Sequence, residues 1–384
     1  MLKNKFLLAL AIFIGTVIGA GIFGIPYVTI KSGIIPGLFY LLVLGGAVLL
    51  IHLFFGEIIL RTKEKCRLIG FSQKYLGNWI KPIIFFSVIL GVTGALLAFL
   101  ILGGEFLRIL FSPIFNLSSY QFTLIFWLSL CYFIFRGIKL IAPAEFFTNL
   151  LFFLIIIIIL GFCFPKFNLT NVSIFNLSNI FLPFGVILFS LIGWSAIPEI
   201  CDFLKNPGEK KKIKKIIISS SIIVIALYLF FALAVIGIAG ENVSQDTLSG
   251  LIPFLGKKII FLIALAAIVT LTDSFLALGL YLRNTFIYDL KLSKTISAIM
   301  TCGFPLLLFL MGFRSFITTI GFVGTIVGAI EGVIIILIFK KVKFLGDREP
   351  EYSLKVPSFL LYFLIGVFVL GAISQVIYFI QILV

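Results

Sequence analysis

Residues 15–27 read GTVIGAGIFGIPY, and this stretch is the strongest indication of the fold. It stands inside the first long apolar run of the chain, yet four glycines and a proline fall within twelve residues, at Gly15, Gly19, Gly21, Gly24 and Pro26. Glycine raises the entropic cost of a helix, and proline removes a backbone donor. The first apolar run is therefore expected to be a helix that is interrupted near its middle.

The composition places this interrupted helix in a membrane. Of the 384 residues, 61% are hydrophobic and only 12% are charged, and the mean hydropathy is +1.26. These values exclude a soluble chain, because a bilayer-spanning helix needs about 20 mostly apolar residues. The apolar runs predict an all-α integral membrane fold with about eleven transmembrane helices. The predicted spans are 6–30, 36–60, 82–111, 119–135, 141–164, 180–204, 214–239, 257–287, 295–313, 315–340 and 357–383.

The basic residues indicate how the chain crosses the membrane. The net charge is +15, and the 30 Lys and Arg form short clusters between apolar runs, which is typical of juxtamembrane segments and argues against a nucleic-acid partner. With a cytoplasmic N-terminus, 24 of the 30 fall on the inner side. The positive-inside rule then predicts a multi-pass protein of the cell membrane, with the N-terminus in the cytoplasm and the C-terminus outside. The six outer residues are Lys31, Arg108, Lys166, Lys257, Lys258 and Arg314.

A second apolar run is interrupted in the same way. Residues 188–200, LFSLIGWSAIPEI, place Ser190, Gly193, Ser195 and Pro198 in the middle of the sixth span. The two interrupted spans are five apart, and a repeated unit of five helices must enter the membrane from opposite sides. The sequence therefore predicts an inverted repeat with units 1–164 and 165–340, each opened by a broken helix. A linker and an eleventh helix follow over 341–384.

Few residues offer catalytic chemistry. His52 is the only histidine, which excludes H-E-x-x-H zinc chemistry, and the five cysteines include no C-x-x-C pair. Gly19, Gly21 and Gly24 form a literal G-x-G-x-x-G, but dinucleotide binding requires a βαβ unit that an apolar helical run does not supply. Neither a cofactor nor an enzymatic activity is therefore predicted.

Two interpretations of the first break are open. Gly15 and Gly19 form a GxxxG pattern, which is typical of close helix packing. The alternative is an unwound segment, because irregular backbone at membrane depth occurs where it is buried or lines a cavity. The freed amides of residues 20–22 would then face an anionic group, and the freed carbonyls of residues 15–19 would face a cation or an ammonium group.

Four stretches resemble one group of transporters. Residues 15–27 and residues 188–207, LFSLIGWSAIPEICDFLKNP, resemble the first and sixth helices of the amino acid–polyamine–organocation superfamily, nearest its aromatic and hydroxy amino acid permease branch. Residues 54–62, FFGEIILRT, are a weaker likeness, and residues 271–293, LTDSFLALGLYLRNTFIYDLKLS, are similar to the eighth helix of sodium symporters. The resemblance implies a LeuT-like fold and a secondary amino acid transporter that works by alternating access with proton or sodium symport.

The resemblance also implies which residues bind the amino acid. The amides of Ala20 and Gly21 would meet its carboxylate, and carbonyls of both broken spans would meet its ammonium group. Its side chain would face Trp194, which resembles the family's aromatic gate, although a tryptophan in an apolar span is also typical of packing. An aromatic and an aliphatic substrate are both compatible with this set. The implied residues are Thr16, Val17, Gly19, Ala20, Gly21, Ile22, Phe189, Ser190, Gly193 and Trp194.

Asp273 is the most informative ionisable residue inside a span. It lies near the middle of the eighth apolar run, where such a group is costly unless it is paired, neutralised or open to water. The resemblance implies a coupling-ion site made of Gly15, Ile18, Thr272 and Asp273. Because an aspartate replaces the family's hydroxyl residue, the ion is either sodium or a proton carried by the carboxyl. Pairing of Asp273 with a Lys or Arg of the bundle is the structural alternative.

Two further alternatives are open. Glu331 lies between Gly328 and Gly332 in a stripe of small residues, where it would serve either gating and proton relay or a packing interface. A non-transporting amino acid sensor on the same fold would bind its ligand without moving it. The expected partners are an amino acid, a proton or sodium ion and the lipid bilayer.

Overall fold

The structure is a computed structural model that describes residues 5–137, 142–163, 165, 168, 172–288 and 290–383. Within these residues all regular secondary structure is helical, which confirms the predicted all-α class. Each of the eleven predicted spans coincides with one helix or with helices in close succession. In this part of the chain, seven helical stretches are long and apolar enough to cross a membrane alone, and the bent first span is an eighth.

The two interrupted spans are broken in the structure as the sequence predicts. The first is divided into α1 (Lys5–Val17), η1 (Ala20–Gly24) and α2 (Ile25–Ser32), and the sixth into α8 (Leu182–Leu191) and α9 (Ala196–Phe203). The other spans are α3 (Ile34–Arg61), α5 (Lys81–Phe111), α6 (Ser119–Arg136), α7 (Ala142–Cys163), α11 (Ile213–Ala239), α13 (Lys257–Tyr288), α14 (Lys294–Leu310), α15 (Phe316–Leu345) and α16 (Ser358–Leu383). Shorter helices between them are α4 (Leu68–Leu76), α10 (Pro207–Lys210) and α12 (Leu248–Leu255).

Local sequence signals set several helix ends. A capping box begins α6, because the Ser118 side chain accepts from Gln121 N while the Gln121 side chain accepts from Ser118 N. The same helix ends at Gly137, whose positive φ of 65° closes the last turn at no steric cost. A proline in the first turn of α8, Pro183, suits the position where its missing N–H has no helical partner.

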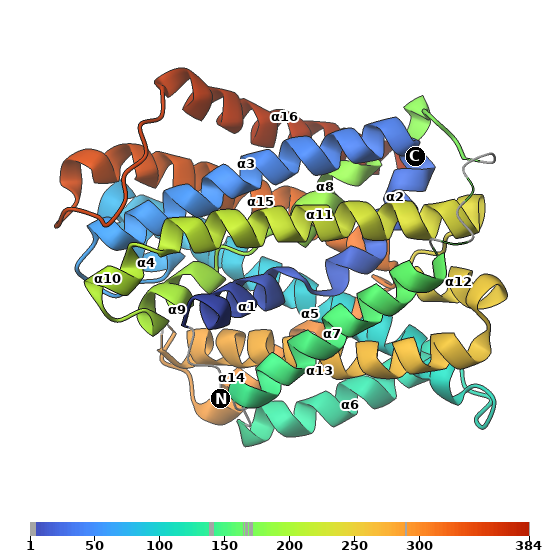
Figure 1. Ribbon diagram of the computed structural model, residues 1–384. Coiled ribbons are helices and arrows are strands. Elements are labelled where there is room, and N and C mark those ends of the chain that lie inside the picture. Colours follow the sequence, from blue (N-terminus) through green and yellow to red (C-terminus); the bar gives the residue numbers. More distant parts are fainter. Residues whose placement is uncertain are drawn as a thin grey trace.

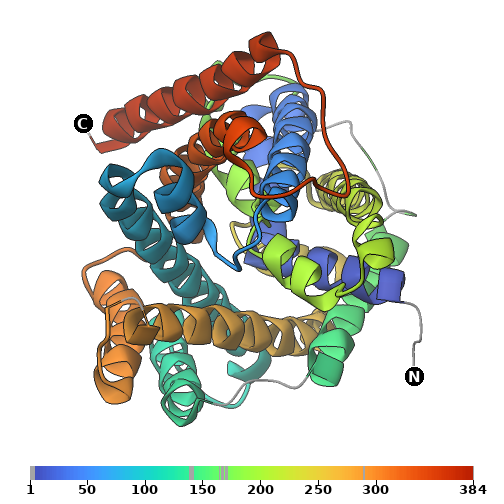
Figure 2. The ribbon, with the colours of Figure 1, turned by 90° about the vertical axis from the view of Figure 1, so that its left-hand side faces the viewer.

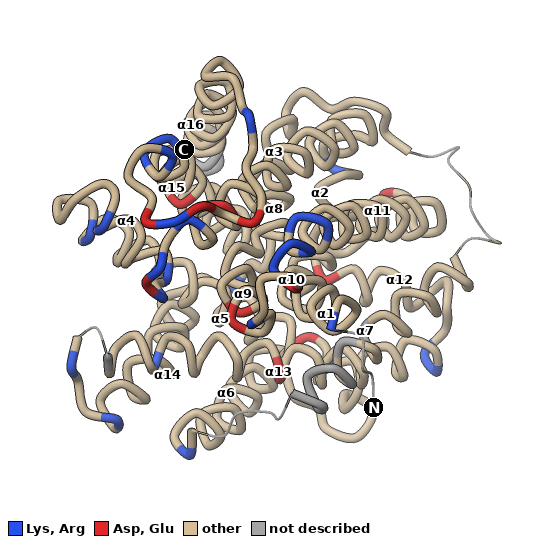
Figure 3. Tube along the Cα trace, turned by 60° about the vertical axis from the view of Figure 1, so that its left-hand side comes forward, with Lys and Arg blue, Asp and Glu red and all other residues tan. Residues whose placement is uncertain are grey.

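The long helices run side by side, with both broken spans among them (Figure 1). Helix α8 packs against α15 and α3, and α1 packs against α11 and α9. Helix α16 lies on the outside of the bundle, against α15 (Figure 2). One end carries α4, α10 and the loop 346–357, together with clusters of Lys and Arg (Figure 3), and is called the basic end below. Helices α2 and α12 lie at the opposite end (Figure 1).

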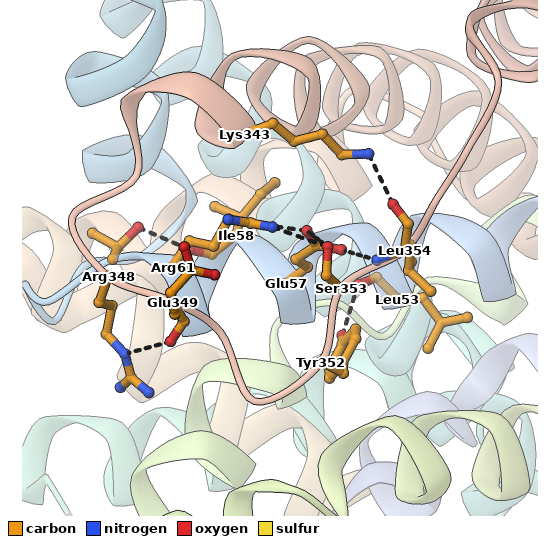
Figure 4. A network of polar contacts seen from close by, with 11 residues as sticks. Leu53, Glu57, Ile58, Arg61, Lys343, Arg348, Glu349, Tyr352, Ser353 and Leu354 are labelled. Carbon is orange, nitrogen blue, oxygen red and sulfur yellow. Dashed lines mark hydrogen bonds and ion pairs between the residues drawn. The ribbon is translucent and has the colours of Figure 1, made fainter.

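At the basic end, the loop between α15 and α16 is fastened to α3 (Figure 4). The Glu57 carboxylate is fully buried and lies 2.8 Å from Arg61 Nε. It also accepts from Leu354 N at 2.7 Å and from Ser353 Oγ at 3.1 Å. Tyr352 Oη donates to Leu53 O at 2.7 Å. The loop is therefore held on α3 by a buried carboxylate whose two oxygens both accept hydrogen bonds.

A second contact joins this loop to α4. Lys74 Nζ lies 2.7 Å from Asp347 Oδ2 and 3.1 Å from Glu64 Oε2. The hydrogen bond from Lys74 holds the pKa of Asp347 below its ordinary value. Because the folded pKa is lowered, the contribution to stability is present at neutral pH and is lost as the pH falls through the folded pKa. Both side chains are partly exposed, so this contribution is small.

The Glu57→Gln variant tests whether the buried carboxylate holds the loop. We expect the free energy of unfolding to fall by about 3 kcal/mol, because removing one partner of a buried ion pair leaves the other without compensation. The measurement is unfolding in detergent micelles, with Glu64→Gln as the control. Glu64 is 69% exposed, so its change is expected to cost less than about 1 kcal/mol. Equal stability losses in the two variants would contradict this role of Glu57.

Candidate substrate and ion site

The first break bends the chain where the glycines are densest. Helix α1 ends at Val17, η1 begins at Ala20, and the helical segments on the two sides are inclined by 50°. Gly21 then approaches the sixth span closely, since a Cβ atom at this position would lie only 2.8 Å from Ser190 Cα. Glycine is the one residue that permits this backbone approach.

The second break lies against the first. Helix α8 ends at Leu191, Ile192 has the extended values φ −62° and ψ 122°, and α9 begins at Ala196. A Cβ atom at Gly193 would collide with the Val17 side chain at the end of α1. The two contacts, Gly21 with Ser190 and Gly193 with Val17, therefore bring both breaks to one level of the bundle.

Tyr228 joins the two breaks through a single hydroxyl. This residue of α11 is fully buried, and its Oη lies 3.2 Å from Val17 O and 2.9 Å from Ser190 O. The two carbonyls belong to different broken spans, and they share the one proton that a tyrosine hydroxyl donates. Sequence reasoning missed this residue. The available signal was its phenol inside an apolar run, because a buried tyrosine usually finds a hydrogen-bond partner.

The structure gathers most of the residues implied for substrate binding. Seven of them are buried around the paired breaks, while Gly19 and Phe189 are half-buried. Gly19 faces Phe99 of α5, whose ring lies 3.7 Å from a Cβ position at Gly19. Thr16 is exposed, and its hydroxyl donates to Ile12 O within its own helix. The seven buried residues are Val17, Ala20, Gly21, Ile22, Ser190, Gly193 and Trp194.

Trp194 is packed inside the bundle by polar and aromatic contacts. It is 3% exposed, and its indole Nε1 donates to Glu331 Oε2 of α15 at 2.6 Å. Ser87 of α5 donates to the other oxygen of Glu331 at 3.4 Å. The Trp194 and His52 rings also pack in a T-shaped arrangement, at 6.2 Å between ring centroids. The segment between α8 and α9 is thus connected to α3, α5 and α15.

Of the implied coupling-ion residues, Asp273 is bonded to a threonine of another helix. Thr148 Oγ1 of α7 donates to Asp273 Oδ2 of α13 at 2.6 Å, and Asp273 is half-buried. Among the described residues Asp273 forms no ion pair, so the Lys or Arg partner of the structural alternative is not found there. Helix α13 packs against α5 and α7, and α1, which carries Gly15, reaches α7. Thr148 was missed in the sequence because one threonine in an apolar run carries no spacing signal.

The end of the site away from the basic end is packed shut. Every residue from Ala20 to Pro26 is buried, and the Phe23 ring lies 5.3 Å from Phe106 between centroids. Thr247, next to α12, donates a hydrogen bond to Phe23 O. The exposed residues at the two breaks, Thr16 and Ser195, lie instead on the side of the basic-end half-helices α1 and α9. The described conformation is therefore closed at the α12 end.

An all-helical membrane bundle in which two broken spans, five apart, meet at one level has the architecture of a secondary transporter. The sequence profile of the tryptophan/tyrosine permease family matches residues 2–375, and the chain belongs to this family. Among solved structures, a similar chain is the crystal structure of MhsT in complex with L-phenylalanine. The match covers 99% of this chain and 98% of that chain, with a TM-score of 0.66 and 14% sequence identity. At this identity the similarity is one of fold. The sequence matches no curated protein.

Tyr228→Phe tests the link between the breaks. Removal of the hydroxyl leaves two buried carbonyls without this donor, so we expect a loss of about 1–3 kcal/mol in the free energy of unfolding. The measurement is detergent unfolding without ligand. Tyr132→Phe is the matched control, since Tyr132 on α6 is 56% exposed. A Tyr228→Phe variant as stable as this control would show that the hydroxyl does not hold the breaks together.

Proposed function

We propose that this protein is a secondary active transporter that moves an aromatic amino acid by alternating access together with a cation. The observation that carries the proposal is the meeting of two broken spans whose carbonyls share the Tyr228 hydroxyl. Irregular backbone at membrane depth marks the binding sites of such transporters. The permease family and the L-phenylalanine held by MhsT support an aromatic side chain.

The substrate would bind between the two breaks. Its carboxylate would meet the amides of Ala20 and Gly21, at the start of the helical segment that continues into α2. Its ammonium group carries three donors and would take over the carbonyls of Val17 and Ser190 from the single proton of Tyr228. The side chain of the substrate would lie against Ile22, Gly193 and Trp194. The space around it would be bordered by Thr16, Gly19 and Phe189.

The coupling ion would bind near Asp273. The Asp273 carboxylate on α13 and the Thr148 hydroxyl on α7 would supply oxygen ligands, and Thr272 would add a second hydroxyl. Carbonyls of Gly15 and Ile18 complete the proposed site when α1 moves toward α13. Oxygen ligands suit sodium, and a half-buried carboxyl also suits a proton. The experiment below therefore tests both ions.

The orientation follows from the basic end. Lys and Arg gather there (Figure 3), and by the positive-inside rule this end and the N-terminus would lie in the cytoplasm. The α12 end, which is packed shut, would then face outward. The half-helices α1 and α9 would move as part of the inverted units 1–164 and 165–340. Ion pairs at their cytoplasmic ends, Lys5 with Glu209 at 2.7 Å and Lys65 with Asp202 at 2.8 Å, would break and reform in the cycle.

The direct test is uptake of labelled aromatic amino acids into liposomes that hold the purified protein. A sodium gradient and a pH gradient are imposed separately. Accumulation driven by either gradient supports a symporter and identifies the ion. Exchange without accumulation would remove the coupling from the proposal, binding without any flux would favour a sensor, and absence of binding would remove the substrate class.

Gly21→Ala should abolish amino acid binding. The added Cβ would lie 2.8 Å from Ser190 Cα, so the two breaks must separate and the amides no longer face the substrate. Gly46→Ala is the control, because a Cβ there meets nothing within 4 Å. Binding is measured by equilibrium dialysis with labelled L-tryptophan. Wild-type affinity in Gly21→Ala would refute the proposed site.

Asp273→Asn should separate transport from its ion gradient. The amide keeps the size and the hydrogen-bond acceptor for Thr148 but removes the charge that holds a cation. We expect accumulation to be lost while exchange across the membrane continues. Glu349→Gln, an exposed loop variant, is the control. Unchanged dependence on the gradient in Asp273→Asn would exclude Asp273 from coupling.

A further inference from the structure

Glu331 is a buried carboxyl group held by neutral partners. It lies in α15, is 6% exposed, and accepts from Trp194 Nε1 at 2.6 Å and from Ser87 Oγ at 3.4 Å. Neither donor carries a charge, and no ion pair of Glu331 occurs among the described residues. An ionised carboxylate inside a membrane bundle without a cation is costly, whereas a protonated carboxyl is not. The local chemistry therefore suits a group that gains and loses a proton.

Among the side chains that the structure describes, the titratable groups on the elements that pack against α15 bond to other partners or lie elsewhere on their helices. Glu57 pairs with Arg61 within α3, and Glu105 pairs with Arg108 within α5. Lys340 of α15 donates to Tyr362 of α16. On α4, Lys74 pairs with Asp347, and Tyr75 is hydrogen-bonded to Thr62. Lys81 begins α5, Lys341 and Lys343 lie in the last turns of α15, and Tyr40 packs on Phe184. Of these described groups, His52 of α3 remains, and its ring packs against Trp194.

The position of Glu331 couples it to the second break. Trp194 lies between α8 and α9, in the segment that must change shape if the half-helices move. One turn before Glu331, a Cβ at Gly328 would lie 3.2 Å from the Ile192 side chain of the same segment. Helix α15 therefore contacts the break at two residues. The Glu331 carboxyl binds Trp194, and the backbone at Gly328 packs against Ile192.

Trp194 stands between two titratable side chains. Its Nε1 binds Glu331, and its ring packs against that of His52, which is 2% exposed. Both ring nitrogens of His52 lack a hydrogen-bond partner among the described residues. A small cavity beside His52 is lined by Phe13, Val17 and Ser221, next to the end of α1. A change of charge at Glu331 would thus be felt at Trp194 through the hydrogen bond between them.

We propose that Glu331 is a proton-binding site that controls the break of the sixth span through Trp194. A proton from bulk water adds to Oε1, the oxygen with the longer bond to Ser87, and the carboxylate becomes a neutral carboxyl. The Trp194 bond to Oε2 then changes from a charge-assisted to a neutral hydrogen bond, which is roughly half as strong. The break is released to move, and loss of the same proton to water restores the tight bond. The inference rests on the proposed function, because it describes how that transporter would sense protons.

The first experiment follows Trp194 itself and needs no transport. The chain has three tryptophans, so Trp79→Phe with Trp127→Phe leaves Trp194 as the only indole. In liposomes without substrate, Trp194 emission should change with pH across the range in which carboxyl and imidazole groups titrate in proteins. Adding Glu331→Gln should abolish the change, whereas adding His52→Gln or Glu105→Gln should leave it.

Three results would overturn the proposal. They are Trp194 emission that does not change with pH, the same pH dependence in Glu331→Gln as in its parent, or a pH dependence that disappears only in His52→Gln. If the double-phenylalanine background does not fold, infrared difference spectra between high and low pH replace the fluorescence. A carboxyl stretching band should then be present in the wild type and absent in Glu331→Gln. An unchanged band would contradict the assignment equally.

A second readout separates this inference from the proposed function. Wild-type protein that neither binds nor moves aromatic amino acids would refute the transport function. The pH dependence of Trp194 emission is measured without substrate, so it would still test Glu331 independently. If the wild type accumulates substrate under a pH gradient, Glu331→Gln should lose that accumulation and keep sodium-driven uptake if any exists. Full pH-driven accumulation in Glu331→Gln would contradict a controlling proton at this residue.

Discussion

Backbone polar groups inside a membrane must find partners within the protein, and the rest of this structure depends on that constraint. Nine of the spans satisfy it as continuous helices, whereas two are broken within the residues that the structure describes. At the breaks, carbonyls of Val17 and Ser190 turn to the same Tyr228 hydroxyl. The two breaks therefore share a partner, and the irregular backbone of both lies in one region of the bundle.

Glycines make this arrangement compact. Gly21 lies on Ser190, Gly193 lies on Val17, and Gly185 of α8 touches the backbone of α15 at Gly324. Spans this close cannot shift independently, because interiors are packed too tightly to absorb the movement. A change at α15 is therefore transmitted to the sixth span, and from there to the first. The same contacts that build the candidate site also connect it to Glu331.

The broken spans could be predicted from the sequence because their cause is local: glycines and prolines crowd inside residues 15–27 and 188–200. The eleven spans follow from hydropathy for the same reason. The partners could not be predicted, since Tyr228 lies 211 positions from Val17, and Trp194 lies 137 positions from Glu331. Thr148 and Tyr228 have no spacing pattern, and only the fold brings them to their partners. Asp273 could be singled out in the sequence because a charge inside a span is unusual by itself, and its part in ion coupling stays a prediction.

The most direct measurement is a structure of the protein bound to L-tryptophan in a lipid nanodisc. We expect the ligand between the two breaks, with its carboxylate on the amides of Ala20 and Gly21 and its ammonium group on the carbonyls of Val17 and Ser190. The Tyr228 hydroxyl should then have left at least one of these carbonyls. A ligand bound elsewhere, with Tyr228 still joined to both carbonyls, would contradict the claim that the paired breaks form the substrate site.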